Sequence, residues 1–214
     1  MRTHASIFAA AAALLAASIT TAHADTLTVG YSNVGLSTGN GLSSSVPALH
    51  LAAQADLPDG YDLTASVTHG KREAASYTDA HAAINGNLPL AIGTIQPGLV
   101  AGYTRIDYSG SYFHDGPGWR MASGYAGARV GYLYAPTQDV SLHAAFEFGR
   151  NFATHYTPRP TIGGLYAAAD IGASMRLGPG ALIVGARLMN LPISQDSGLH
   201  IRAAEYRIGY AMAF

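Results

Sequence analysis

The chain has 214 residues, of which 49% are hydrophobic and 12% are charged, and its formal net charge is −1. The charged fraction is about half that of an ordinary soluble domain, and a nearly neutral chain offers no electrostatic basis for binding nucleic acid. Cysteine is absent, which excludes disulfides, thiolate nucleophiles and zinc-thiolate sites.

The first segment has the features of a secretory signal peptide. A basic residue at position 2 precedes an apolar run over 7–19, and the Ala-His-Ala sequence that ends at Ala24 is a small-x-small cleavage motif. The run is shorter than the roughly 18–20 residues that a membrane-spanning helix needs. We therefore expect a signal peptide over 1–24, cleaved after its last residue on export, and one mature domain over 25–214.

In the first half of the mature chain, segments alternate apolar and polar residues, which is typical of strands with one apolar face. They are bounded by Gly/Ser-rich loops and by a Pro-Asp-Gly turn. The predicted strands are 27–32, 49–57, 61–68, 80–88 and 99–103, and the predicted loops are 35–46, 70–78 and 107–120.

The second half shows clearer alternation, best seen over 140–149, where aliphatic and aromatic residues occupy every second position. Turns are predicted at 135–139 and 178–180, and a proline-containing loop at 150–161. The predicted strands are 125–134, 140–149, 165–177, 182–188 and 199–214. The pattern therefore predicts ten strands, with eight as the alternative if the fourth and fifth are misread.

The lengths of the connections indicate how these strands are arranged. Short turns at 58–60, 135–139 and 178–180 alternate with longer loops at 35–46, 107–120 and 150–161, as they do in transmembrane barrels. Many of the strands reach the roughly 9–11 residues that cross a bilayer when tilted. In hydrocarbon the sheet must close, because an open edge would leave backbone groups unpaired. We therefore predict an all-β, closed, antiparallel up-and-down transmembrane barrel.

The closing strand carries a family resemblance. Its apolar face is formed by Tyr206, Ile208, Tyr210, Met212 and Phe214. This alternating aromatic ending with a terminal Phe resembles the last strand of Gram-negative outer-membrane β-barrels, in particular the small OmpA/OmpX-like, porin-type barrels. The resemblance implies a location in the cell outer membrane, contact with outer-membrane lipid and lipopolysaccharide, and recognition of the last strand by the barrel-assembly machinery.

The face opposite the apolar one indicates which side meets lipid. In a soluble, lipocalin-like barrel that face would be crowded with Lys, Glu and Thr, whereas here it is Gly, Ala and Ser with a few charges. Unpaired charges in a narrow lumen would be costly, so we predict an internal ionic network that plugs it; the alternative places individual members at the water-exposed rims. The candidate residues are Arg129, Glu147, Asp170, Arg176, Arg187, Glu205 and Arg207.

Aromatic residues on the apolar face are predicted to form the belts at the two membrane interfaces. The candidates are Tyr61, Tyr103, Tyr132, Tyr134, Tyr206, Tyr210 and Phe214.

Residues that could carry chemistry form no convincing constellation. His114 and Asp115 are adjacent in one predicted loop and His155 lies in another, but neighbouring loop residues do not ordinarily aim at one substrate. The mature chain lacks the His-x-Ser spacing of the lipid A deacylases, and it has no HExxH, P-loop or dinucleotide motif. We therefore predict no catalytic residue, no cofactor and no metal site.

The expected function is that of a small monomeric outer-membrane barrel with a structural or cell-surface interaction role and a narrow, plugged lumen. Two alternatives stay open. One is a barrel enzyme that modifies lipid A or cleaves peptides at the outer rim, and the other is a narrow channel.

Overall fold

The computed structural model describes residues 25–38, 43–108, 119–157, 164–192 and 200–214. These residues form long β-strands and one single-turn 3-10 helix, η1 (Pro58–Gly60). The strands are β1 (Thr26–Thr38), β2 (Ser43–Leu57), β3 (Tyr61–Arg72), β4 (Ala75–Gly86), β5 (Leu88–Pro89), β6 (Thr94–Tyr108), β7 (Trp119–Tyr134), β8 (Val140–Thr157), β9 (Leu165–Leu177), β10 (Gly180–Pro192) and β11 (His200–Ala213). Among the described residues, no helix has the length and hydropathy to span a bilayer.

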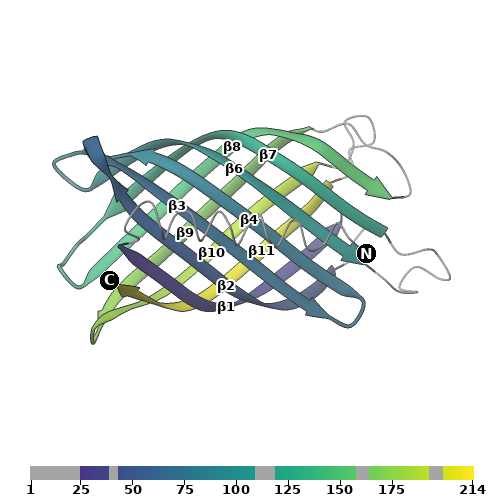
Figure 1. Ribbon diagram of the computed structural model, residues 1–214, viewed down its shortest axis with the longest axis horizontal. Coiled ribbons are helices and arrows are strands. Elements are labelled where there is room, and N and C mark those ends of the chain that lie inside the picture. The colour runs from purple at the N-terminus through teal and green to yellow at the C-terminus, as the bar shows by residue number, and fades with distance from the viewer. Residues whose placement is uncertain (1–24, 39–42, 109–118, 158–163, 193–199) are drawn as a thin grey trace.

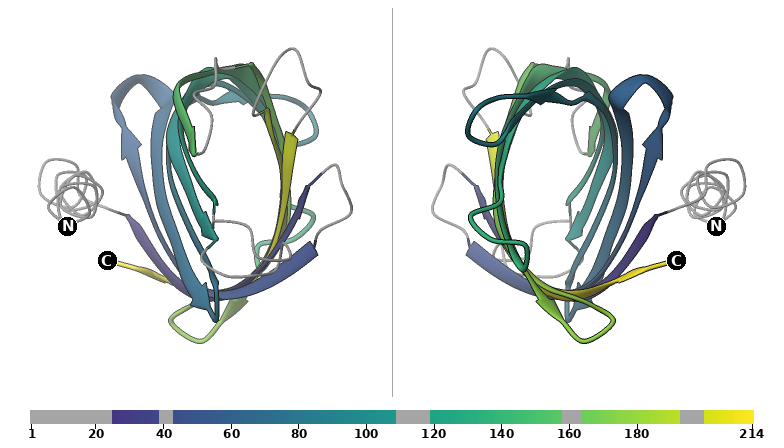
Figure 2. Two further views of the ribbon diagram at one scale, coloured as in Figure 1. Left: turned by 90° about the vertical axis from the view of Figure 1, so that its right-hand side faces the viewer. Right: turned by 90° about the vertical axis from the view of Figure 1, so that its left-hand side faces the viewer.

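The strands close into a single antiparallel barrel (Figure 1). The order is β4-β3-β2-β1-β11-β10-β9-β8-β7-β6, and β4 pairs with β6 to complete the ring. The two-residue β5 pairs only with the start of β6, so ten long strands make the wall. Views along the long axis show the strands arranged in a ring (Figure 2). The predicted ten-stranded barrel is therefore confirmed, and the eight-stranded alternative is wrong.

The two ends of the barrel differ. The connections 58–60, 87–93, 135–139 and 178–179 lie at one end, here called the turn end, together with Asp25 and Phe214 (left in Figure 1). The backbone of Phe214 donates a hydrogen bond to the carbonyl of Asp25 at 3.3 Å, and β1 pairs with β11 along its whole length. The other end, here called the loop end, holds the turn over 73–74 and the strand termini Thr38, Ser43, Tyr108, Trp119, Thr157, Leu165, Pro192 and His200.

Polarity in the wall is inverted relative to a water-soluble protein. Large apolar side chains, including Val130, Phe146 and Ile208, are exposed on the outside. Glu147 and Glu205, in contrast, are buried in the interior. A lipocalin-like barrel would bury its apolar face and expose its charges. The soluble alternative is therefore contradicted by the exposure of the side chains.

Several strands extend further toward the loop end than the sequence predicted. Within the predicted loop 35–46, residues 35–38 and 43–46 belong to β1 and β2, and β8 continues to Thr157 through most of the predicted loop 150–161. The predicted loop 70–78 is wrong, because β3 and β4 meet at a tight turn over 73–74, where Glu73 has a positive φ of 49°. Strands that project beyond a bilayer can be hydrated on both faces, so the alternation of polarity fades although the ladder continues.

Two glycines make a close contact between β7 and β8. Gly127 pairs with Gly149, and a Cβ at Gly127 would collide with the carbonyl oxygen of Phe148 and lie 2.7 Å from the Cα of Gly149. We expect Gly127→Ala to lower the folded fraction after refolding into detergent, measured by gel mobility without boiling. Gly35→Ala is the matched control, because its Cβ would meet its nearest atom at an ordinary 3.7 Å. Equal folded fractions for the two variants would contradict the close packing.

Candidate functional site in the barrel interior

Glu147 is the centre of the largest interior polar cluster. It projects inward from β8, and only 1% of its surface is exposed. Its Oε2 accepts hydrogen bonds from Arg187 Nη2 at 2.9 Å and from the Tyr166 hydroxyl at 2.6 Å. Its Oε1 lies 3.0 Å from His81 Nε2 and 3.6 Å from Arg129 Nε. Burying a carboxylate is costly unless it is paired and hydrogen-bonded, and the β4, β7, β9 and β10 strands supply those partners.

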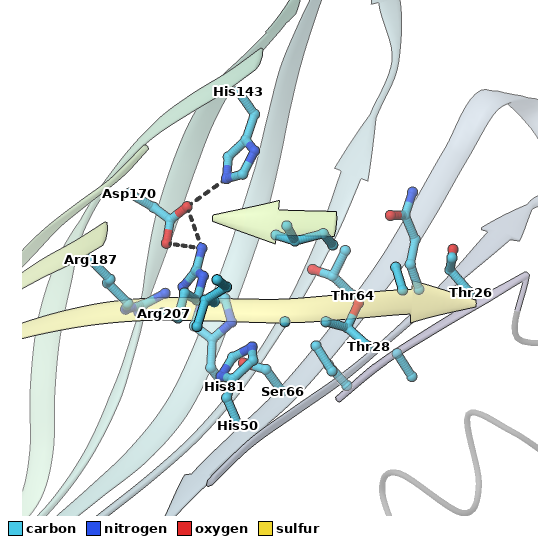
Figure 3. Close-up of a pocket in the computed structure, with 18 of the residues that line it drawn as sticks. Thr26, Thr28, His50, Thr64, Ser66, His81, His143, Asp170, Arg187 and Arg207 are labelled. Carbon is cyan, nitrogen blue, oxygen red and sulfur yellow. Dashed lines mark hydrogen bonds and ion pairs between the residues drawn. The ribbon is translucent and has the colours of Figure 1, made fainter. Parts of the chain in front are cut away.

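A second cluster surrounds Asp170 on β9 (Figure 3). Arg207 Nη2 donates to both carboxylate oxygens, at 2.8 and 2.7 Å. His143 Nε2 lies 2.8 Å from Oδ1. Because the guanidinium of Arg207 is charged and contacts both carboxylate oxygens, this is among the stronger hydrogen-bonding arrangements. Asp170 therefore links β8, β9 and β11 through side chains.

Glu205 forms a third cluster on β11, near β1, β2 and β3. Its Oε1 accepts hydrogen bonds from Ser32 Oγ at 2.7 Å and from Thr68 Oγ1 at 3.0 Å. His50 Nδ1 lies 3.4 Å from the same oxygen and 2.9 Å from Thr68 Oγ1. This buried carboxylate is thus surrounded mainly by hydroxyls.

Of the seven residues predicted for an ionic network, the structure turns Arg129, Glu147, Asp170, Arg187, Glu205 and Arg207 into the interior; Arg176 lies apart. Arg129 also donates to Asn85 Oδ1 at 2.7 Å. The exposed Arg176 is at the turn-end tip of β9, next to the 178–179 turn. Its position matches the alternative in which single members occupy a rim.

The ionic network predicted from the sequence did not include the histidines and the tyrosine that complete these clusters. His50, His81 and His143 each face a carboxylate, and Tyr166 contacts both Glu147 and Arg187. Their only signal in the sequence is their place on the polar side of an alternating strand. Some partners lie on the neighbouring strands β8 and β9, but others, such as His81 on β4 and Glu147 on β8, come from strands far apart in sequence, so their pairing depends on how the ring closes.

A cavity of about 240 Å³ lies beside the Glu147 and Asp170 clusters. Its lining includes the arginines and histidines of the clusters and, toward the turn end, Thr26, Thr28, Gln54 and Thr64 (Figure 3). The cavity therefore occupies the half of the interior that is nearer the turn end.

Apolar side chains predominate in the half of the interior nearer the loop end, beside the buried polar residues Asp79, Thr104, Ser123 and Asn151. This apolar layer consists of Val34, Leu36, Val46, Tyr77, Ile106, Met121, Leu191 and Ile201, all of them buried. Below it, the rings of Tyr125 and Tyr166 stack with their centroids 4.2 Å apart. The interior thus changes from a polar cavity, through the ionic clusters and the stacked tyrosines, to a close-packed apolar layer.

The predicted interface aromatics lie at different depths in the wall. Tyr61, Tyr132 and Tyr134 are exposed near the turn end. The remaining residues are Tyr103 in the loop half of β6, Tyr210 near the end of β11, Phe214 beyond it, and Tyr206. Tyr206 is exposed in the middle of β11, opposite Asn33 and Ala186, so it lies away from the strand ends where the belt was predicted.

The residues weighed for catalysis fall largely outside the described part of the chain. His114 and Asp115 lie outside it, and for His155 only the backbone is described. Within the described ranges, no group of three or more His, Asp or Glu side chains is placed to hold a metal ion.

Comparison with known proteins shows likeness in structure only. No protein-family model and no curated protein matches the sequence. Neisserial surface protein A aligns with 88% of this chain and 96% of its own, at 13% identity and a TM-score of 0.46. The β-domain of the Bordetella autotransporter Brka aligns with 89% of this chain and 99% of its own, at 12% identity and a TM-score of 0.48. The attachment invasion locus protein of Yersinia pestis aligns with 87% and 97%, at 10% identity and a TM-score of 0.37.

The assignment of the chain follows from its own geometry. A closed ring of ten antiparallel strands, with both described ends beside the short turns, is the topology of a transmembrane barrel. Its apolar outer wall and buried interior carboxylates fit lipid outside and polar side chains within. The chain thus has the fold of the small Gram-negative outer-membrane β-barrels, which confirms the resemblance inferred from its closing strand.

Proposed function

We propose that this protein is a monomeric integral outer-membrane barrel that has a structural or interaction role at the cell surface and whose own side chains occlude its lumen. The observation that carries the proposal is the succession of buried layers in the interior, ionic and then apolar. A solute moving from the turn end would first meet Arg187 and Glu147, which are both almost fully buried. It would then meet the layer in which buried apolar side chains predominate, where few groups could replace its hydration.

The outer wall supports an outer-membrane location. Its exposed apolar residues extend over all ten long strands, whereas soluble monomers rarely expose contiguous apolar patches larger than a few hundred Å². The partners that follow from this location are outer-membrane lipid, lipopolysaccharide and, for β11 with Phe214, the barrel-assembly machinery. The short turns at the end that holds Asp25 and Phe214 fit the periplasmic side, which leaves the loop end at the cell surface.

The proposed role is not enzymatic. Each of the buried carboxylates Glu147, Asp170 and Glu205 is already engaged by arginine, histidine or hydroxyl groups. Such groups satisfy the buried charge, and this fits a structural network that ties distant strands together.

The occluded lumen is tested by recording from planar lipid bilayers. We expect the refolded protein to produce no large, stable conductance steps, because the interior is filled at the level of Ile106 and Met121. Samples should first show different gel mobilities before and after boiling, which establishes that a folded barrel was reconstituted. Large, long-lived open steps from such a sample would contradict the proposal and favour a channel.

A further inference from the structure

The outer surface of the barrel has a groove in its loop half. Its volume is about 520 Å³, and its outward-facing residues come from β1 and from β8 to β11. Two rows across the paired strands form it: Gly35, Ala204, Leu188, Ala169 and Phe146 in one, and Ser37, Arg202, Asn190 and Ala167 in the other.

Small side chains explain why the wall is hollow at this place. Gly35, Ala167, Ala169 and Ala204 project little; Ala169 lies between the bulkier Phe146 and Leu188, and Ala204 and Gly35 follow on the other side of Leu188. Viewed along the barrel axis, the loop-end parts of β1 and β2 also turn outward from the line of β11 (Figure 2). The groove is therefore apolar along most of its length and lies on the surface that we assign to lipid.

The groove has a polar end toward the loops, formed by Arg202, Asn190 and Ser37. Arg202 is exposed and is paired on its two sides with Ser37 and Asn190. Within the ranges that the structure describes, no acidic side chain forms an ion pair with it. An apolar groove that ends at an exposed guanidinium is complementary to a hydrocarbon chain attached to an anionic headgroup.

Charge on the rest of the barrel points the same way. Among the described residues outside the buried interior, the loop half carries the basic residues Lys71, Arg72, Arg105, Arg120, Arg150 and Arg202, with the acidic residues Asp107 and Glu73. The turn end exposes the acidic residues Asp25, Asp56, Asp59 and Asp139, with the basic residue Arg176. Such a separation favours anionic headgroups at the loop end, which is the outer-leaflet side of the proposed orientation.

We propose that the groove binds an acyl chain of the lipid A part of lipopolysaccharide and that Arg202 contacts one of its phosphates. This inference rests on the outer-membrane orientation given under the proposed function. Any lipid-facing wall touches acyl chains. The Arg202 contact is what makes this site selective, because a guanidinium can donate two hydrogen bonds to one phosphate. Lipopolysaccharide is the phosphorylated lipid of the outer leaflet, so it is the occupant that fits a groove at this end.

The test is a titration of the folded protein in detergent micelles with bisphosphorylated lipid A, followed by native mass spectrometry. Two variants address the two halves of the site: Arg202→Gln removes the cation, and Ala169→Trp fills the groove. We expect Arg202→Gln to weaken lipid A binding roughly tenfold, as for the loss of one charge-assisted hydrogen bond, and Ala169→Trp to weaken it because the indole takes the place of the acyl chain. Dephosphorylated lipid A should bind the wild type and Arg202→Gln equally weakly.

The matched control is Arg150→Gln, which removes another exposed basic residue of the loop half outside the groove. Its affinity should equal that of the wild type, and an equal loss would mean non-specific charge attraction and overturn the site. Unchanged binding by Arg202→Gln and Ala169→Trp, or equally tight binding of phosphatidylglycerol, would overturn it too. Heat-modifiable gel mobility and fractionation with the outer membrane test the proposed function separately. If the wild type shows both, the negative binding results refute only the lipid A site in the groove. If the wild type shows neither, the proposed function is refuted.

Discussion

Replacing Ile171 with arginine is expected to destabilise the barrel by about 2–4 kcal/mol, the cost of a basic side chain near the midplane on the lipid face of a transmembrane barrel. Ile171 is the middle residue of β9 and is 59% exposed. In a water-soluble protein, a charge at such an exposed site would change the free energy of unfolding by no more than about 0.5 kcal/mol. The variant therefore distinguishes lipid from water around the barrel.

Leu165→Arg is the matched control for this experiment. Leu165 is the first residue of the same strand, at the loop end, and is 76% exposed. Near the interface the expected cost falls to about 0–1 kcal/mol. Urea titrations in phospholipid vesicles, with the folded fraction read from gel mobility, give both values. Equal stabilities for the wild type, Ile171→Arg and Leu165→Arg would show that the apolar wall does not face hydrocarbon.

The sequence predicted the wall of the barrel well because its signal is local. Along β8, Phe146 and Phe148 alternate with Glu147, and the structure places the aromatics outside and the carboxylate inside. The same parity rule turned Arg187 and Glu205 inward. Alternation along one strand is set by backbone geometry, so the inward or outward direction of a side chain can be predicted without knowing the neighbouring strands.

What the sequence could not predict depends on contacts across the ring. The bond between Tyr166 and Glu147 joins neighbouring strands, but His81 reaches Glu147 from β4, 66 residues away. Such partners are fixed only when strand order, tilt and register are all known. The groove at Ala169 and Ala204 was not predicted for the same reason, because alanines are ordinary apolar positions in the sequence until the five strands that form the groove bring them together.

The tight turn between β3 and β4 was missed for a different reason. Lys71, Arg72 and Glu73 together read as a solvated loop, yet the ladder continues to the pair of Arg72 with Ala75. At the loop end of a membrane barrel a strand leaves hydrocarbon before it ends, so charged residues no longer indicate that a strand has stopped.

Arg187→Met is expected to cost about 3–5 kcal/mol of stability, because it removes one partner of a buried ion pair and leaves the other charge behind. Arg187 donates to Glu147 Oε2 and to the Tyr166 hydroxyl, both at 2.9 Å. Methionine retains an unbranched apolar side chain at this position, so the loss of stability measures mainly the removal of the charge. Urea titration in vesicles measures it, and Arg176→Met, at an exposed arginine with a rim position, should stay within about 0.5 kcal/mol of the wild type.

The double variant Glu147→Gln with Arg187→Met tells whether the cost arises from the unpaired carboxylate. If it does, neutralising Glu147 should recover part of the stability that Arg187→Met loses, because His81 and Tyr166 can hydrogen-bond to an amide and Arg129, 3.6 Å from Glu147, keeps its hydrogen bond to Asn85. Two strictly additive losses would mean that Arg187 and Glu147 do not act as a pair. If Arg187→Met alone were as stable as the wild type, the ionic cluster would not contribute to closing the interior.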